Sequence, residues 1–295
     1  MASIDDVMSD YAWPNILFLT LDSCRFDTAA MARTPALDKV GALHRALSPG
    51  TFTLPSHMSF FAGMLPHVPD QPHLDYYSRE ARRLWRLYGA RKASTAHHLT
   101  LEGGTLVEGF RKAGYFTMGG GGVRWFRSPI LRAGFDKFVF RGVDDYSNAF
   151  VGRERSDFVL ADPERLVDPI PRAKPWFLFA NLIETHAPYD DGILPLSDEL
   201  LDIQGRAQAV WSDRRLKSLQ TNVTPAEFKL MHAAQIRALE TADARIQALI
   251  DLLPRPFIAI ICGDHGECFG ENGAWGHCFP APAVMEVPIY IGAVT

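Results

Sequence analysis

The sequence predicts an α/β fold built around a mostly parallel sheet, and three observations carry this prediction. Short, wholly apolar segments recur along the 295 residues, as expected for strands buried on both faces. Segments with helix-capping signals lie between them. Acidic or imidazole side chains follow three of the expected strands. Alternating strands and helices favour a parallel sheet covered by helices.

The first half of the chain begins with the clearest strand, residues 15–21, which is apolar on both faces. This strand ends at Asp22, so it places a carboxylate at the carboxyl edge of the sheet, where open α/β sheets bind ligands. A helix is expected from Thr34, which caps it, with a proline in the first turn. A second helix is expected at residues 106–113, closed by Gly114.

In the middle of the chain, a strand at residues 115–118 is expected to run into the glycines at 119–122. Another buried strand is expected at residues 176–183. The strongest helix signal begins at Thr224, where a proline follows and Glu227 can complete a capping box. An apolar stripe continues this helix.

Two prolines end that helix, and a buried strand is expected at residues 257–262. It delivers Asp264 and its neighbour histidine to the same sheet edge as the first strand. A last strand is expected at residues 287–292. The polar segments 69–98 and 192–222 are expected to be surface loops, with insertions or lids as the alternative.

Composition sets bounds on location and partners. A 47% hydrophobic fraction and a 22% charged fraction are those of a soluble globular protein. The net charge of -4 argues against nucleic acid or an anionic membrane as partner. No secretory signal or apolar span is evident, and only four cysteines are present. We therefore expect a cytoplasmic protein with free thiols, and a single domain over residues 1–295.

Three strand ends carry side chains that can bind a metal. They are Asp22, the segment 184–186 with its Glu and His, and Asp264 with His265. Several such groups at one sheet edge indicate a metal site. Carboxylate and imidazole ligands favour one divalent ion, zinc or manganese, with calcium or magnesium as the oxygen-preferring alternatives.

A hydroxyl nucleophile is expected at Thr53, with Thr51 as the competing residue. Pro55 suits the first turn of a helix, so Thr53 lies at or just before the N-terminus of that helix. Free N–H groups and the partial positive charge there would stabilise a bound oxyanion. Coordination to a divalent cation would activate the hydroxyl.

Four groups of residues follow one another in a characteristic order. They are residues 21–27, then 53–57 with Gly63 and 66–67, then 184–189, and then 263–267 with 270–273 and 276–277. They resemble the metal motif, the nucleophile segment, the His-x-Pro-Tyr element and the Asp-His-Gly block of sulfatase-like hydrolases in the alkaline phosphatase superfamily. The resemblance implies an alkaline-phosphatase-like three-layer sandwich around the sheet.

The resemblance also implies roles for individual residues. The expected metal ligands are Asp22, Thr53, Asp264 and His265. His186 and His277 are expected to contact the anionic oxygens of a small ester or to protonate its leaving group. Thr53 replaces the Cys or Ser that sulfatases convert to formylglycine, and His57 stands where sulfatases have Arg. We therefore expect a phosphoester hydrolase working through a phospho-threonine, on a phosphodiester, phosphonate or monoester.

Other interpretations stay open from the sequence. One is a sulfate-ester hydrolase of the same fold, and another is a catalytically silent metal-binding partner in a biosynthetic complex. The family's C-terminal subdomain is expected to be absent, so internal insertions, a homo-oligomer or a partner subunit would complete the substrate pocket. A structural zinc site is a further alternative, built from Cys268, Cys278, His265 and His277.

Overall fold

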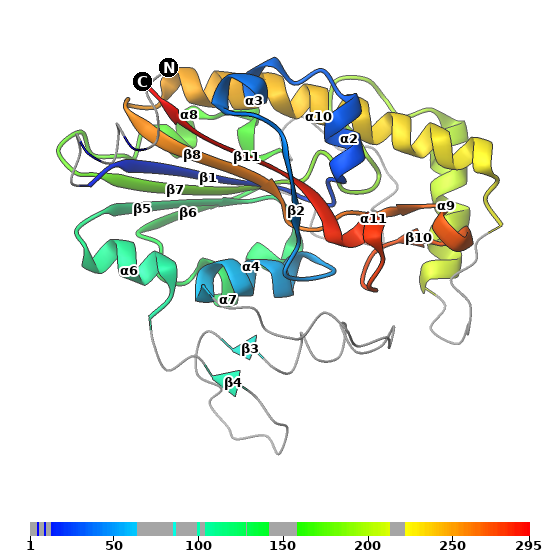
Figure 1. Cartoon of the computed structure of the whole chain (residues 1–295), viewed down its shortest axis with the longest axis horizontal. Helices are drawn as coiled ribbons and strands as arrows, with labels where there is room; N and C mark the ends of the chain where they lie inside the picture. Colours follow the sequence, from blue (N-terminus) through cyan, green and yellow to red (C-terminus); the bar gives the residue numbers. More distant parts are fainter. Residues whose placement is uncertain are drawn as a thin grey trace.

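The computed structural model describes residues 13–63, 85–86, 99–100, 104–127, 129–141, 158–212 and 222–295, and the single positions 5 and 9. A central sheet of seven strands forms its middle layer (Figure 1). In chain order these strands are β1 (Asn15–Leu21), β2 (His44–Leu47), β5 (Phe116–Gly121), β6 (Lys137–Phe140), β7 (Trp176–Leu182), β8 (Phe257–Gly263) and β11 (Glu286–Val294). Two short ribbons are β3 (Trp85–Arg86) with β4 (Leu99–Thr100), and β9 (Cys268–Phe269) with β10 (Trp275–Gly276).

The order of strands in the sheet is β2-β11-β8-β1-β7-β5-β6. The five strands from β8 to β6 run parallel, whereas β11 is antiparallel to both of its neighbours. The predicted mostly parallel α/β sheet is therefore confirmed. Because β1 lies between β7 and β8, their carboxyl ends meet at one edge.

Helices cover both faces of the sheet, which gives three layers (Figure 1). One face carries α2 (Phe26–Met31), α3 (Pro35–Val40), α8 (Glu164–Val167) and α10 (Pro225–Leu252). The other carries α4 (Thr53–Ala62), α6 (Leu106–Lys112) and α7 (Pro129–Arg132). The remaining elements are α9 (Asp198–Ser212), α11 (Pro282–Met285), η1 (Arg124–Arg127), η4 (Val159–Ala161) and η5 (Glu271–Gly273).

Alternation along β1 divides the core between the two helical layers. Leu17, Leu19 and Leu21 belong to the aliphatic cluster that includes the buried face of α10. Phe18 points the other way, into an aromatic cluster with residues of α4. The same alternation turns Thr20 toward α4, so β1 brings polar side chains to the helix that begins at the expected nucleophile.

The cap of α3 differs from the prediction. Thr34 occupies the N-cap position, but its side chain makes no capping hydrogen bond. The carboxylate of Asp243, from α10, accepts instead from the backbone N–H groups of Ala36 and Leu37, at 3.0 and 2.9 Å. A residue distant in the sequence thus caps this helix. The capping box predicted at Thr224 is present in full.

Two other expectations need correction. Residues 192–222 were expected to be irregular, yet they contain α9, which buries Leu200, Ile203 and Ala207. Glycines 119–121 belong to β5 itself. A Cβ on Gly121 would lie 2.4 Å from Phe126, so the glycines make room for neighbouring side chains. Segment 69–98 lies outside the described residues, except 85–86.

Across the described part of the chain, no helix combines the length and apolar character needed to cross a membrane.

Candidate active site

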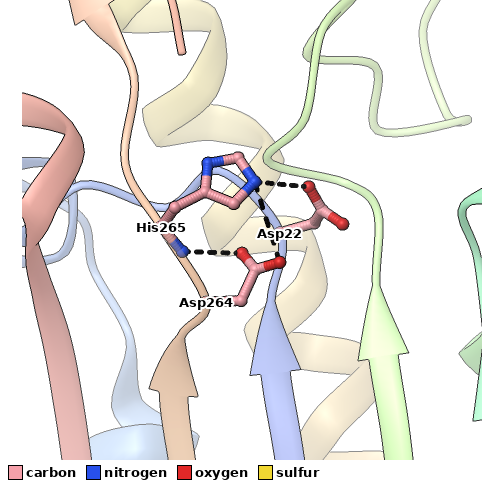
Figure 2. A group of neighbouring side chains, drawn as sticks. All are labelled: Asp22, Asp264 and His265. Carbon is pink, nitrogen blue, oxygen red and sulfur yellow. Dashed lines mark hydrogen bonds and ion pairs between the residues drawn. The ribbon is translucent and has the colours of Figure 1, made fainter. Parts of the chain in front are cut away.

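Three buried side chains meet where β1 and β8 end side by side (Figure 2). Leu21 pairs with Gly263, so the residues that follow, Asp22 and Asp264, emerge next to each other. His265 Nε2 lies 3.6 Å from Asp22 Oδ1 and 3.7 Å from Asp264 Oδ2. One ligand atom from each residue fits within a 4.8 Å group, and among the described residues no other His, Cys, Asp and Glu side chains form such a group.

The hydrogen bonds of this group leave ligand atoms unused. Asp264 Oδ1 accepts from the backbone N–H groups of Ser23 and His265, at 3.1 and 2.9 Å. His265 Nδ1 donates to the carbonyl of Gly266 at 2.9 Å, so Nε2 presents its lone pair. Asp264 Oδ2 and His265 Nε2 are buried and have no hydrogen-bond partner. Such orphaned acceptors fit a cation bound between them.

The charges of the group point the same way. Burial, and then the neighbouring Asp22 carboxylate, raise the pKa of Asp264 well above its ordinary value. Burial lowers the pKa of His265 to about 3, so the imidazole is neutral and able to act as a ligand. Two buried carboxylates without a cation repel each other. A divalent ion would remove that repulsion, and the donor set of two carboxylates and an imidazole suits zinc or manganese.

Thr53 is the first residue of α4, and its hydroxyl donates to Asp22 Oδ2 at 3.3 Å. The residue before it, Phe52, supplies no side-chain cap, so the first N–H groups of the helix are not capped by a side chain. The competing Thr51 is buried, and its hydroxyl has no hydrogen-bond partner. The structure therefore brings Thr53 to the candidate metal ligands.

His57 supports the turn that carries Thr53, a role that the sequence did not indicate. Its Nδ1 lies 2.7 Å from the Thr53 carbonyl, which can only accept, so Nδ1 carries the proton. Nε2 then accepts from the Thr20 hydroxyl at 2.8 Å. Asn181 Nδ2 donates to Thr20 Oγ1 at 3.2 Å and to Asp22 Oδ2 at 3.1 Å. This network runs from Asp22, a candidate metal ligand, to the backbone of Thr53, the candidate nucleophile.

His186 and His277, which are expected to contact the ester, lie beside the group. The ring of His277 is centred 4.5 Å from that of His265 and 5.4 Å from that of His186. His277 Nδ1 lies 2.8 Å from Glu267 Oε1, and Tyr189 Oη donates to Glu267 Oε2 at 2.9 Å. Burial raises the pKa of Glu267 to about 7. Glu267 lies in the Asp-His-Gly block that the sequence shows, but its contact with His277 forms only in the folded loop and could not be predicted from that block.

Other side chains near the motifs have structural roles. Arg25 forms ion pairs with Asp27 at 2.6 Å and with Glu271 at 2.7 Å. Glu184, expected at the metal-binding edge, instead pairs with Arg245 at 2.9 Å. The alternative zinc site is not supported, because Cys268 and Cys278 join no metal-sized group among the described residues.

The three-layer fold, with an acid–histidine group at its sheet edge, is the alkaline-phosphatase-like fold that the sequence predicts. The model of the sulfatase family matches residues 14–288, and the chain belongs to that family. Curated protein sequences give no significant match.

Solved structures show the same fold at low sequence identity. The C-terminal periplasmic domain of EptC from Escherichia coli, in complex with zinc, has a TM-score of 0.57 at 13% identity, over 95% of this chain and 72% of that one. A 2-O GAG sulfatase has a TM-score of 0.60 at 16% identity, over 95% and 64%. The soluble domain of lipooligosaccharide phosphoethanolamine transferase A from Neisseria meningitidis has 0.56 at 16%, over 97% and 78%. The chain is thus a member of a family whose fold serves hydrolases and transferases.

Proposed function

We propose that this protein is a metal-dependent hydrolase of phosphate esters that uses Thr53 as its nucleophile. The observation that carries the proposal is the contact between Thr53 Oγ1 and Asp22 Oδ2, at 3.3 Å, beside two orphaned ligand atoms. Asp22, Asp264, His265 and Thr53 would hold one divalent ion, zinc or manganese. Bound there, the ion would lower the pKa of the Thr53 hydroxyl and neutralise charge on the ester oxygens.

In the first step, Thr53 Oγ1 attacks phosphorus, and its proton leaves along the hydrogen bond to Asp22. The bond to the leaving alkoxide breaks as the new P–O bond forms, which gives a phospho-threonine. The N–H groups in the first turn of α4, which no side chain caps, stabilise charge on the phosphoryl oxygens. Water then attacks phosphorus and gives a proton to the group that protonated the alkoxide, while the bond to Thr53 breaks and Thr53 Oγ1 takes back the proton from Asp22, which releases phosphate.

The leaving alkoxide needs a proton, and the pair of His277 and Glu267 can supply it. Burial raises the pKa of Glu267 to about 7 and lowers that of His277 to about 4. Near neutral pH the imidazole is therefore neutral, and one further proton can lie between Glu267 Oε1 and His277 Nδ1. With that proton on Glu267, the carboxyl donates to His277 Nδ1 and leaves a proton on Nε2. Transfer from Nε2 to the alkoxide is then balanced by transfer from Glu267 to Nδ1. His186, whose Nδ1 lies 2.8 Å from the Ala187 carbonyl, contacts the ester oxygens through Nε2.

Phosphate chemistry is preferred to sulfate chemistry because Thr53 has a branched Cβ and does not yield formylglycine by the usual conversion. A sulfate-ester hydrolase is the second candidate, since one similar structure is a 2-O GAG sulfatase and another relative was solved with D-glucosamine-2-N,6-O-disulfate. A silent metal-binding partner of a biosynthetic complex is the third. The second candidate would act on a small anionic ester, and the third would bind a protein partner.

The deciding experiment measures turnover of nitrophenyl phosphate, phosphodiester, phosphonate and sulfate esters by zinc- or manganese-loaded protein. We expect phosphorus esters to be hydrolysed, and Thr53→Ala to abolish turnover. Thr51→Ala is the matched control and should retain activity. Acid-quenched protein should carry phosphate on Thr53, detectable by mass spectrometry. Full activity of Thr53→Ala would refute the nucleophile, and sulfate turnover alone would favour the second candidate.

A further inference from the structure

Gln235 is a fully buried amide in the middle of α10, and its nitrogen reaches two separate loops at the sheet edge. Nε2 lies 2.9 Å from the carbonyl oxygen of Ser23 and 2.9 Å from that of Thr185. Oε1 accepts from the hydroxyl of Thr28 at 2.6 Å. Carbonyl oxygens only accept, so the amide nitrogen must face them, and the orientation of Gln235 is unambiguous. Its two N–H groups therefore bind two loops together.

The first of these loops controls Asp264. Ser23 has a left-handed backbone, with φ of 61°, which is uncommon for a residue other than glycine. In this conformation its N–H donates to Asp264 Oδ1 at 3.1 Å, while its carbonyl accepts from Gln235. Asp264 Oδ2 is left without a partner. The N–H groups of Ser23 and His265 together occupy Oδ1 and leave Oδ2 as the oxygen available to a cation.

The second loop controls Asp22. Thr185 Oγ1 donates to the backbone carbonyl of Asp22 at 2.6 Å, and the carbonyl of Thr185 itself accepts from Gln235. The same loop carries His186. Asp264 thus accepts from a loop residue, Ser23, that Gln235 binds, and the backbone of Asp22 accepts from another, Thr185, that Gln235 also binds.

We infer that Gln235 is a positioning residue for the metal site, acting through Ser23 on Asp264 and through Thr185 on Asp22. This inference rests on the metal site of the proposed function. A residue that only stabilised the fold would lower the free energy of unfolding and leave the affinity for metal unchanged. A positioning residue changes the affinity as well, because the ligands no longer meet in the required geometry.

The test compares Gln235→Met with Gln204→Met in the full-length protein. Methionine has nearly the shape of glutamine but cannot donate to a carbonyl. Gln204 is the matched control, because it is equally buried and its Nε2 donates to a carbonyl, that of Pro188, at 2.8 Å. For each variant, the dissociation constants of Zn²⁺ and Mn²⁺ are measured by competition with a chromogenic chelator, and the melting temperature is measured in EDTA.

We expect both variants to melt at lower temperature, but only Gln235→Met to bind metal about 10- to 100-fold more weakly. Unchanged affinity in Gln235→Met would overturn the inference while leaving the proposed function intact. A wild-type protein that binds neither ion would overturn both. If Gln235→Met does not fold, Thr28→Val decides: it removes the hydroxyl that orients Gln235, and it should weaken metal binding several-fold. Equal affinity in that variant would overturn the inference.

Discussion

His57 Nδ1 donates a hydrogen bond to the backbone carbonyl of Thr53, one helical turn earlier, at 2.7 Å. The other ring nitrogen accepts from Thr20. Edges and faces of four phenylalanine rings surround the imidazole: Phe60, Phe61, Phe126 and Phe179. His57 is therefore a neutral, dry imidazole that holds the first turn of α4.

The pH dependence of stability tests this description of His57. Burial lowers its pKa to about 4 in the folded state, whereas an unfolded histidine titrates near pH 6.5. Between these values the unfolded chain binds the extra proton, so folding is favoured above pH 6.5 and the advantage is lost as the pH falls toward 4.

We expect the free energy of unfolding of wild type, minus that of His57→Phe, to fall by on the order of 3 kcal/mol over this window. Urea titrations of metal-free protein at several pH values measure it. Taking the difference removes the contribution of the other buried histidines. A difference that does not vary with pH would contradict a buried, neutral His57.

Asp264 should destabilise the metal-free protein and be needed for metal binding. Its pKa is raised by burial and by Asp22, so above the ordinary value of 3.8 the folded state keeps a proton that the unfolded chain has lost. The metal-free protein therefore loses stability as the pH rises from 3.8 toward the raised pKa. We expect Asp264→Asn to stabilise the protein in EDTA by about 1 kcal/mol or more. Metal at 100 times its dissociation constant should stabilise wild type by about 2.7 kcal/mol and leave the variant unchanged.

Asp243→Asn is the control for this experiment, because Asp243 is also buried with a raised pKa but caps α3 away from the site. That variant should respond to metal as wild type does. Thermal scans in EDTA and in Zn²⁺ distinguish the two. An Asp264→Asn variant that still gains stability from Zn²⁺ would remove Asp264 from the ligand set.

Glu267 should matter for turnover through His277. We expect Glu267→Gln to lower kcat on a nitrophenyl phosphoester by about 10²-fold, because His277 loses the partner that shares its proton. KM should change little. Glu271→Gln is the control, since Glu271 lies in the same sequence block but binds Arg25. Steady-state kinetics decide, and equal loss in both variants would mean that the block as a whole has been disturbed.

The glycines around the end of β5 should be needed for packing. A Cβ on Gly122 would lie 2.1 Å from Ile183 Cγ2, whereas Gly109, in α6, faces open space. Gly122→Ala should therefore destabilise the protein by about 1–3 kcal/mol. Gly109→Ala should stabilise it by up to about 1 kcal/mol. Denaturant unfolding measures both, and a neutral Gly122→Ala would show that the chain gives way there.

The sequence was sufficient for the parts of the site that follow strands. Asp22, Asp264 and His265 come directly after apolar strands, and parallel strands bring their carboxyl ends to one edge. The place of Thr53 at the start of a helix could also be predicted, because Pro55 marks the first turn of that helix. These placements use local patterns and the geometry of a sheet, whereas the roles expected of the residues came from the resemblance to sulfatase-like hydrolases.

The supporting residues could not be predicted in the same way. Gln235 and Asp243 lie on α10, more than 200 positions after Ser23 and Ala36, whose backbone groups they bind, and a buried polar residue in a helix gives no sign of its partner. Glu184 follows a strand, as do the residues of the candidate metal site, but it forms an ion pair with Arg245 of α10. Helix α9 was missed although its buried residues recur at helical spacing, because its overall composition is polar and it contains Gly205.

The central position of β1 has a consequence for biosynthesis. Ser23 and Asp264, which share a hydrogen bond at the candidate metal site, are separated by 241 positions. Strand β8 is made long after β1, so the two strands can pair only when the residues between them have left the ribosome. Contacts of such long range form slowly. An ion that needs both Asp22 and Asp264 would therefore bind only after β1 and β8 have paired, so the supply of metal would act on molecules whose central strands are already in place.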